Sequence, residues 1–170
     1  MLKTVVSACA FTMLVCTGTA SAQDRLSDRI FANAMVGIGT SRAGASTDAV
    51  GAVGFRATNY LSINGEGGSQ SFKPYGQLTG LEKRAYRIGG DARFELDATP
   101  QVRPFISAGL GNLVAKRTTG GSVHDWHTSV GMGVNAWPTS YLGFGAIYRA
   151  MFVDNGTNHY FTAGIVFGKR

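Results

Sequence analysis

The sequence is poor in cysteine, in proline and in clustered charge, and each shortage excludes a class of protein. The two cysteines, Cys9 and Cys16, both lie in an initial segment that we expect to be cleaved off. Disulfides, on which many exported domains of this size depend, are therefore excluded from the remaining chain. Only four prolines accompany 24 glycines, and no Gly-x-y period is present, which excludes collagen and flexible-linker interpretations.

Charge is also thinly spread along the chain. The formal net charge is +6 and the isoelectric point is about 9.6, values that would suggest a nucleic-acid partner for a cytosolic protein. The basic residues are spread along the chain in groups of no more than two, however, so we expect no nucleic-acid partner. Glycine makes up 24 of the 170 residues, which fits short strands, tight turns and a crowded interior.

The first residues have the three parts of a secretory signal. Lys3 is the positive residue, Val5–Val15 is the apolar core, and Ala20-Ser21-Ala22 forms an Ala-x-Ala cleavage pattern before Gln23. The apolar core is too short to cross a bilayer as a helix, which needs roughly 20 residues. The pattern predicts a signal peptide over 1–22 and export of the rest.

A lipoprotein signal that uses Cys16 is the competing interpretation of this segment. Val15 precedes that cysteine, where such signals have a small residue, and we therefore prefer cleavage after Ala22. Residues 23–170 then form a single domain.

The mature chain divides into eight segments of roughly ten residues, the length of a transmembrane β-strand. Several alternate apolar side chains with small or polar ones, which is the two-residue period of a strand. The expected strands are Arg29–Thr40, Ala49–Ala57, Tyr60–Phe72, Arg84–Leu96, Arg103–Lys116, Trp126–Trp137, Tyr141–Val153 and Asn158–Gly168.

The segment Arg84–Leu96 has the clearest division into two faces. One face carries Tyr86, Ile88, Gly90, Ala92, Phe94 and Leu96, and the other carries Arg87, Asp91, Arg93 and Glu95. In a soluble sheet the charges would face water, whereas in a membrane barrel they would face the lumen. The period alone does not separate these two cases.

The lengths of the connections favour a membrane barrel. Those near 57–60, 97–102 and 138–140 are short, and they alternate with mostly longer ones near 41–48, 73–83, 117–125 and 154–157. Short turns on one rim and long loops on the other are typical of outer-membrane barrels.

Aromatic residues near the expected strand ends fit belts at the two membrane interfaces. These are Phe31, Tyr60, Phe72, Tyr75, Tyr86, Phe105, Trp126, Trp137, Tyr141, Phe152, Tyr160 and Phe167.

Three strand motifs resemble those of small outer-membrane β-barrel proteins of the opacity-protein and porin type. They are Arg103-Pro104-Phe105-Ile106-Ser107-Ala108-Gly109-Leu110-Gly111, Val130-Gly131-Met132-Gly133-Val134-Asn135-Ala136 and Leu142-Gly143-Phe144-Gly145-Ala146-Ile147-Tyr148-Arg149. Phe167 is followed by Gly168-Lys169-Arg170, whereas members of this family often end on an aromatic residue.

The resemblance implies an all-β, eight-stranded, antiparallel up-and-down transmembrane barrel in the outer membrane. Its implied partners are outer-membrane lipid, lipopolysaccharide and the barrel-assembly machinery, with contact to host or envelope components through the loops. No cofactor and no enzymatic activity are implied.

The charges on the inward faces form the candidate site. We expect them to be ion-paired and to plug the narrow interior of an eight-stranded barrel, since an unpaired buried charge is unfavourable. A gated ion path is the alternative. The residues are Arg56, Glu66, Arg87, Asp91, Arg93, Glu95 and Arg149.

A second candidate function is that of an outer-membrane lipid A deacylase, a class of barrel with a His-x-Ser pair and a downstream Glu. His127 and Ser129 have this spacing and share a strand face. No Glu follows them, Asp154 is the only later acid, and the alternation directs both side chains inward rather than to lipid. The sequence therefore favours a protein that is not an enzyme.

Two weaker interpretations complete the set. His124, Asp125, His127 and His159 suggest a metal site, but we expect no metal and interpret them as histidines without partners. A soluble periplasmic binding barrel is the third candidate function. The inward charges disfavour it, because a ligand cavity prefers an apolar lining.

Overall fold

The computed structural model describes residues 28–41, 44–72, 81–96, 99, 101–154 and 156–169, without the side chains of 72 and 81–83. The predicted signal peptide, 1–22, lies outside the described residues. Within them, no helix is long and apolar enough to cross a membrane.

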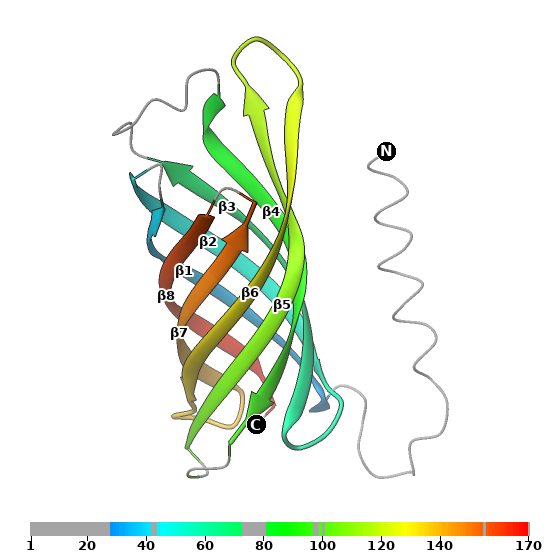
Figure 1. Ribbon diagram of the computed structural model, residues 1–170. Helices are drawn as coiled ribbons and strands as arrows, with labels where there is room; N and C mark the ends of the chain where they lie inside the picture. Colours follow the sequence, from blue (N-terminus) through cyan, green and yellow to red (C-terminus); the bar gives the residue numbers. More distant parts are fainter. Residues whose placement is uncertain are drawn as a thin grey trace.

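Eight antiparallel strands form one closed barrel, in which each strand pairs with its neighbour in sequence and β8 pairs with β1 (Figure 1). Closure follows from the register, since Phe31 lies opposite Gly168 and Thr40 opposite His159. The strands are β1 (Ile30–Ser41), β2 (Gly44–Arg56), β3 (Leu61–Phe72), β4 (Leu81–Glu95), β5 (Val102–Arg117), β6 (Ser122–Ala136), β7 (Leu142–Val153) and β8 (Gly156–Gly168).

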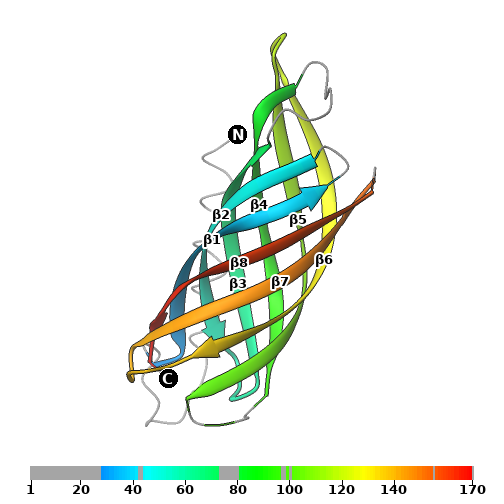
Figure 2. The ribbon, with the colours of Figure 1, turned by 90° about the vertical axis from the view of Figure 1, so that its left-hand side faces the viewer.

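The barrel has two different rims, which are named here for reference. The terminal rim carries the start of β1, the end of β8, the described connections 57–60 and 137–141, and the end of β4 beside the start of β5. The opposite rim carries the hairpin between β5 and β6, which extends past the neighbouring strands (Figures 1 and 2). The strands lie oblique to the long axis of the barrel (Figure 2).

Side chains alternate between lumen and outer surface in every strand. In β4, Arg87, Asp91, Arg93 and Glu95 are buried, while the intervening Ile88 and Phe94 are about half exposed. The two faces thus have the polarity of a membrane barrel, which confirms the predicted fold class. Other large apolar side chains on the outer surface include Val36, Ile38, Val53, Ile63, Ile106, Leu110, Val130, Met132, Phe144, Phe161 and Ile165.

The expectation that the connections near 41–48, 117–125 and 154–157 are mostly longer than those of the terminal rim was wrong. Strands β2, β6 and β8 begin at Gly44, Ser122 and Gly156, so the strand ladders fill most of these ranges. The turns are tight because glycines adopt the left-handed backbone region there, as Gly120 does with φ of 95° and Gly121 with φ of 88°. The fourth connection, 73–80, lies outside the described residues.

Four of the residues assigned to aromatic belts were also placed wrongly. Phe31, Phe105, Trp137 and Tyr160 are at most 3% exposed, because the strand alternation directs them into the lumen. The first three belong to an apolar cluster with Met35, Val50, Ile147 and Val166. On the outer surface lie Tyr60, Tyr86, Trp126, Tyr141, Phe152 and Phe167, while Tyr75 and the side chain of Phe72 are outside the described residues.

Glycines on inward faces let large lumen side chains fit. A Cβ on Gly111 would lie 2.6 Å from the carbonyl oxygen of Ile88 and 2.7 Å from Cε1 of His127. Both distances are shorter than van der Waals contact, so only glycine fits at this position without a shift of strand β4 or of the imidazole. The high glycine content therefore has a packing cause in the lumen.

We expect Gly111→Ala to lower the free energy of unfolding by about 1–3 kcal/mol, the usual effect of overpacking. The matched control is Gly65→Ala on β3, because a Cβ there meets nothing within 4 Å. Urea titration of both variants in lipid vesicles measures the effect. Equal unfolding free energies for the two variants would contradict the crowded lumen.

Candidate functional site: the charged lumen

Arg149 of β7 is the centre of an ion-pair network that crosses the lumen. Its Nη1 donates a hydrogen bond to Oε1 of Glu66 on β3. Its Nη2 donates to Oδ2 of Asp91 on β4, at 2.9 Å. These partners lie 83 and 58 residues away in sequence, so one guanidinium connects three strands from different parts of the barrel.

Arg87 of β4 extends this network toward β2. Its Nη2 lies 2.9 Å from Oδ2 of Asp48, and its Nε lies 3.7 Å from Oε1 of Glu66. The guanidinium also lies over the ring of Tyr160, 5.7 Å from the centroid, and the Tyr160 hydroxyl donates to Oε1 of Gln70 at 3.0 Å. Charged, aromatic and amide groups thus fill this level of the lumen together.

Arg93 completes the network toward the terminal rim. Its Nε lies 3.2 Å from Oδ1 of Asp91, and Asn64 donates its Nδ2–H to the same oxygen at 2.6 Å. The Arg93 guanidinium lies 5.0 Å from the ring centroid of Phe105. Asp91 therefore accepts hydrogen bonds from two arginines and one amide, which satisfies a carboxylate that is 4% exposed.

The network balances its own charge. It contains three arginines (Arg87, Arg93 and Arg149) and three acids (Asp48, Glu66 and Asp91), all buried. Buried ions are tolerated when each has an opposite charge and further hydrogen bonds. The cavity bordered by these groups has a volume of about 10 Å³, room for about one water molecule.

The structure brings together five of the seven residues proposed from the sequence: Glu66, Arg87, Asp91, Arg93 and Arg149. Glu95 instead pairs with Arg103, whose Nη1 lies 3.5 Å from its Oε2.

Arg56 lies apart from these residues, at the terminal rim. Its guanidinium stands 5.3 Å from the ring centroid of Phe31 and 5.5 Å from that of Trp137. Its Nη1 also donates to the backbone carbonyl of Lys169.

Sequence reasoning missed Asp48, which is 3% exposed and pairs with Arg87. The miss follows from assigning 41–48 to a loop. The signal was present, because Ser46, Asp48, Val50 and Ala52 continue the inward period of β2, and all four are buried. Extending the alternation to the N-terminal side would have found the missing acid.

His127 and Ser129 point into the lumen, as the alternation predicted, and are 4% and 6% exposed. Among the described residues, Nδ1 of His127 has no hydrogen-bond partner, so no acid orients the imidazole as a base. The ring lies instead against Gly111. The acid of a nucleophilic triad is therefore missing beside His127 in the ranges that the structure describes.

The interpretation of the remaining histidines as partnerless was wrong. Nδ1 of His124 lies 3.3 Å from Oδ1 of Asn112, and Nδ1 of His159 lies 2.7 Å from the hydroxyl of Tyr148. Within the described part of the chain, no group of three or more His, Cys, Asp or Glu residues could hold a metal ion.

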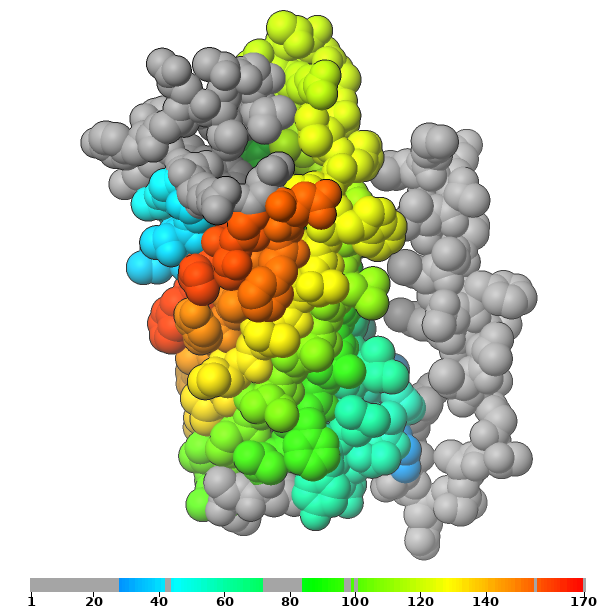
Figure 3. All heavy atoms as spheres, in the orientation of Figure 1, coloured from blue at the N-terminus to red at the C-terminus, as the bar shows by residue number. Residues whose placement is uncertain are grey.

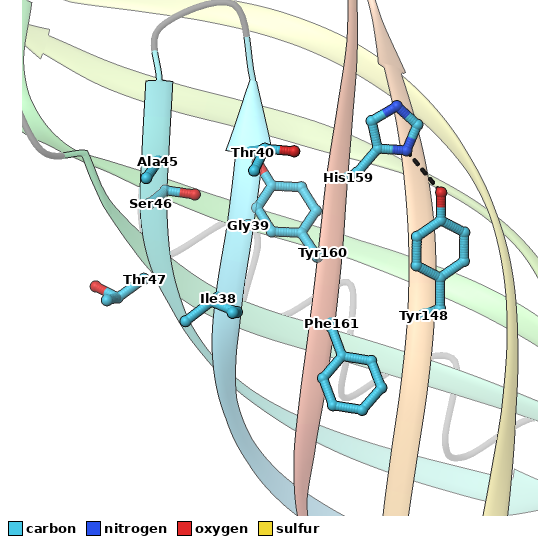
Figure 4. Close-up of a pocket in the computed structure, with 10 residues that line it drawn as sticks. All are labelled: Ile38, Gly39, Thr40, Ala45, Ser46, Thr47, Tyr148, His159, Tyr160 and Phe161. Carbon is cyan, nitrogen blue, oxygen red and sulfur yellow. Dashed lines mark hydrogen bonds between the residues drawn. The ribbon is translucent and has the colours of Figure 1, made fainter. Parts of the chain in front are cut away.

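The Tyr148–His159 pair borders a shallow groove on the outer surface, across β2, β1, β8 and β7 (Figure 4). The two rings are nearly parallel, with centroids 6.1 Å apart. The groove has a volume of about 370 Å³, and apolar Ile38 and Phe161 lie at one end, with Thr47 opposite Ile38, while Thr40 lines it farther along. The groove is therefore accessible from outside the barrel.

Comparison with known proteins identifies the fold. No family model and no curated protein sequence matches the chain. Among solved structures, Neisserial surface protein A is similar with a TM-score of 0.65 and 21% identity, over 81% of this chain and 94% of that one.

Two further barrels are similar. The N-terminal β-barrel domain of Pseudomonas aeruginosa OprF has a TM-score of 0.63 and 16% identity, over 82% of this chain and 96% of that one. Ail, the attachment invasion locus protein of Yersinia pestis, has a TM-score of 0.55 and 11% identity, over 82% and 95%. The chain thus has the fold of the small eight-stranded outer-membrane barrels, which confirms the resemblance seen in the sequence and agrees with the predicted outer-membrane location.

Proposed function

We propose that the chain is a non-conducting, non-enzymatic outer-membrane barrel that presents a rigid sheet to molecules outside the cell. The observation that carries this proposal is the charge-balanced network around Arg149, which fills the lumen where a pore or a ligand cavity would lie. A binding pocket for a small molecule needs at least about 300 Å³. The cavity at the network has about 10 Å³, so the lumen is built as a plug.

Contact with other molecules is assigned to the opposite rim. An exported chain reaches the outer membrane from the periplasm, and the terminal rim, which carries the start of β1 and the end of β8, stays on that side. The hairpin of β5 and β6 then projects outward from the cell (Figure 1). Its ladder is continuous from Lys116 and Ser122 down to Val102 and Ala136, which makes the projection an extension of the barrel wall.

The named properties of two similar proteins fit an outward contact. Neisserial surface protein A is a surface protein by name. Ail is named for attachment and invasion, and it has also been solved with the heparin analogue sucrose octasulfate. We propose a corresponding contact of this chain with a host or envelope component.

Lipid is the proposed partner of the outer wall. The exposed apolar side chains favour contact with lipid acyl chains. The groove between Ile38, Phe161 and the Tyr148–His159 pair is the proposed position of one acyl chain. The net positive charge favours lipopolysaccharide phosphates. Phe167 faces outward at the terminal rim, where the barrel-assembly machinery would find an aromatic side chain.

We expect the wild-type barrel to give no stable current steps in planar lipid bilayers. The double variant Glu66→Ala/Arg149→Ala removes the central ion pair and shortens two side chains that fill the lumen. We therefore expect small conductance steps to appear. The control is Asp28→Ala/Lys169→Ala, which removes an exposed ion pair and is expected to stay closed. Steady conductance by the wild type would refute the plug.

The orientation is tested with single cysteines, since the expected mature chain has none. On intact cells, a membrane-impermeant maleimide is expected to label Thr119→Cys at the hairpin tip and to spare Asn59→Cys at the terminal rim. Labelling of both variants after the membrane is disrupted is the control. The reverse pattern on intact cells would place the hairpin in the periplasm.

A further inference from the structure

The projecting part of β6 has a strand neighbour on one side only. Its pairing with β5 runs from Ser122 to Ala136, but its pairing with β7 begins at Thr128, opposite Phe152. Ser122–His127 therefore has a free edge, as judged from the described residues. Figures 1 and 3 show this hairpin rising past the end of β7.

The hydrogen-bond pattern shows which backbone groups lie on this edge. The N–H of Arg117 donates to the carbonyl of Gly121 at 3.1 Å, and the N–H of Trp137 donates to the carbonyl of Gln101 at 2.7 Å. Residues with odd numbers in β6 thus bond to β5, because the direction of backbone groups alternates along an antiparallel strand. The N–H and C=O groups of Ser122, His124 and Trp126 consequently point away from β5.

This edge lacks the devices that usually protect an edge strand. Ser122–His127 contains no proline, the β5–β6 register shows no bulge, and Asp125 is its only acidic or Lys/Arg residue. The side chain of Trp126 is 70% exposed beside the unpaired groups. A regular, unprotected edge of this kind is a template for a further strand.

We propose that an extended segment of a partner polypeptide adds to the free edge of Ser122–His127 as an additional antiparallel strand. Three donor–acceptor residues spaced two apart match the repeat of another β-strand, a match that neither a lipid nor a glycan backbone offers. The indole of Trp126 supplies a side-chain contact, and Lys116 and Arg117 at the tip favour an acidic residue in the partner. This inference rests on the proposed outward orientation of the hairpin.

A second copy in the same membrane fits this edge less well. Both copies of β6 would run in the same direction relative to the membrane, so their edges could pair only in parallel. Parallel pairing is slightly weaker per residue, and its slanted bonds suit a short edge poorly. A separate segment is free to run antiparallel to β6.

The test compares His124→Pro with His124→Ala. Proline removes the outward N–H of residue 124 without breaking a bond to β5, and it is tolerated at an edge. Alanine removes the same imidazole and its contact with Asn112, but keeps the N–H. Heat-modifiable migration on a gel confirms that both variants fold.

The probe is a phage-displayed library of random twelve-residue peptides, selected on the wild-type barrel in lipid nanodiscs. We expect selected peptides to bind at least about tenfold more weakly to His124→Pro, from the lost hydrogen bond and the blocked approach, and to retain affinity for His124→Ala. Slower hydrogen exchange at the amides of Ser122, His124 and Trp126 on peptide binding supports the same register.

Three outcomes would overturn the inference: no peptide above background, equal weakening by both variants, or a wild-type dimer that His124→Pro dissociates. The last outcome would assign the edge to a second copy. Peptide binding to nanodiscs combined with no labelling of Thr119→Cys on intact cells would refute the proposed orientation while leaving the edge site standing.

Discussion

The ion pair between Arg149 and Glu66 is the interaction on which the rest of the lumen depends. An eight-stranded barrel has an interior just wide enough for side chains, so charges there cannot be hydrated in bulk. Arg149 resolves this by binding Glu66 and Asp91, and Arg87 and Arg93 then complete the coordination of those acids. Because the six members come from β2, β3, β4 and β7, the same contacts that neutralise the charge also tie the wall together.

The strands could be predicted from the sequence because apolar and polar side chains alternate regularly in the middle of the strands. Arg87, Asp91, Arg93 and Glu95 on one face and Ile88 and Phe94 on the other already required a strand with one charged and one apolar face, and the barrel turns the charged face to the lumen. Sequence reasoning failed at the strand ends, where polar side chains look alike whether they form a loop or face a lumen. For that reason Asp48 was assigned to a connection and not to the lumen. Three aromatic residues were assigned to the membrane surface although they fill the lumen, namely Phe31, Phe105 and Trp137. Which arginine pairs with which acid depends on the register between strands, and the sequence of one strand does not show that register. Glu95, for example, pairs with Arg103 rather than with Arg93.

Because the connections that the structure describes on the opposite rim are short turns, the part of that rim available for contact is the regular hairpin of β5 and β6. Connections mostly longer than those of the terminal rim were expected on the opposite rim, whereas β5 and β6 continue as a regular ladder to a glycine turn at Gly120 and Gly121. A closed barrel removes free strand edges, but a hairpin that outgrows its neighbour restores one. The filled lumen and the extended hairpin therefore both support the proposed contact at the rim rather than passage through the barrel.

The central claim is that Glu66 and Arg149 stabilise the closed barrel as a pair, and a double-mutant cycle tests it most directly. Unfolding free energies are measured in lipid vesicles for the wild type, Glu66→Gln, Arg149→Met and the double variant. A coupling energy of about 1–3 kcal/mol is predicted, because each single change takes from a buried charge one of its two opposite charges. A coupling energy below about 0.5 kcal/mol, with the single effects simply adding, would contradict the account.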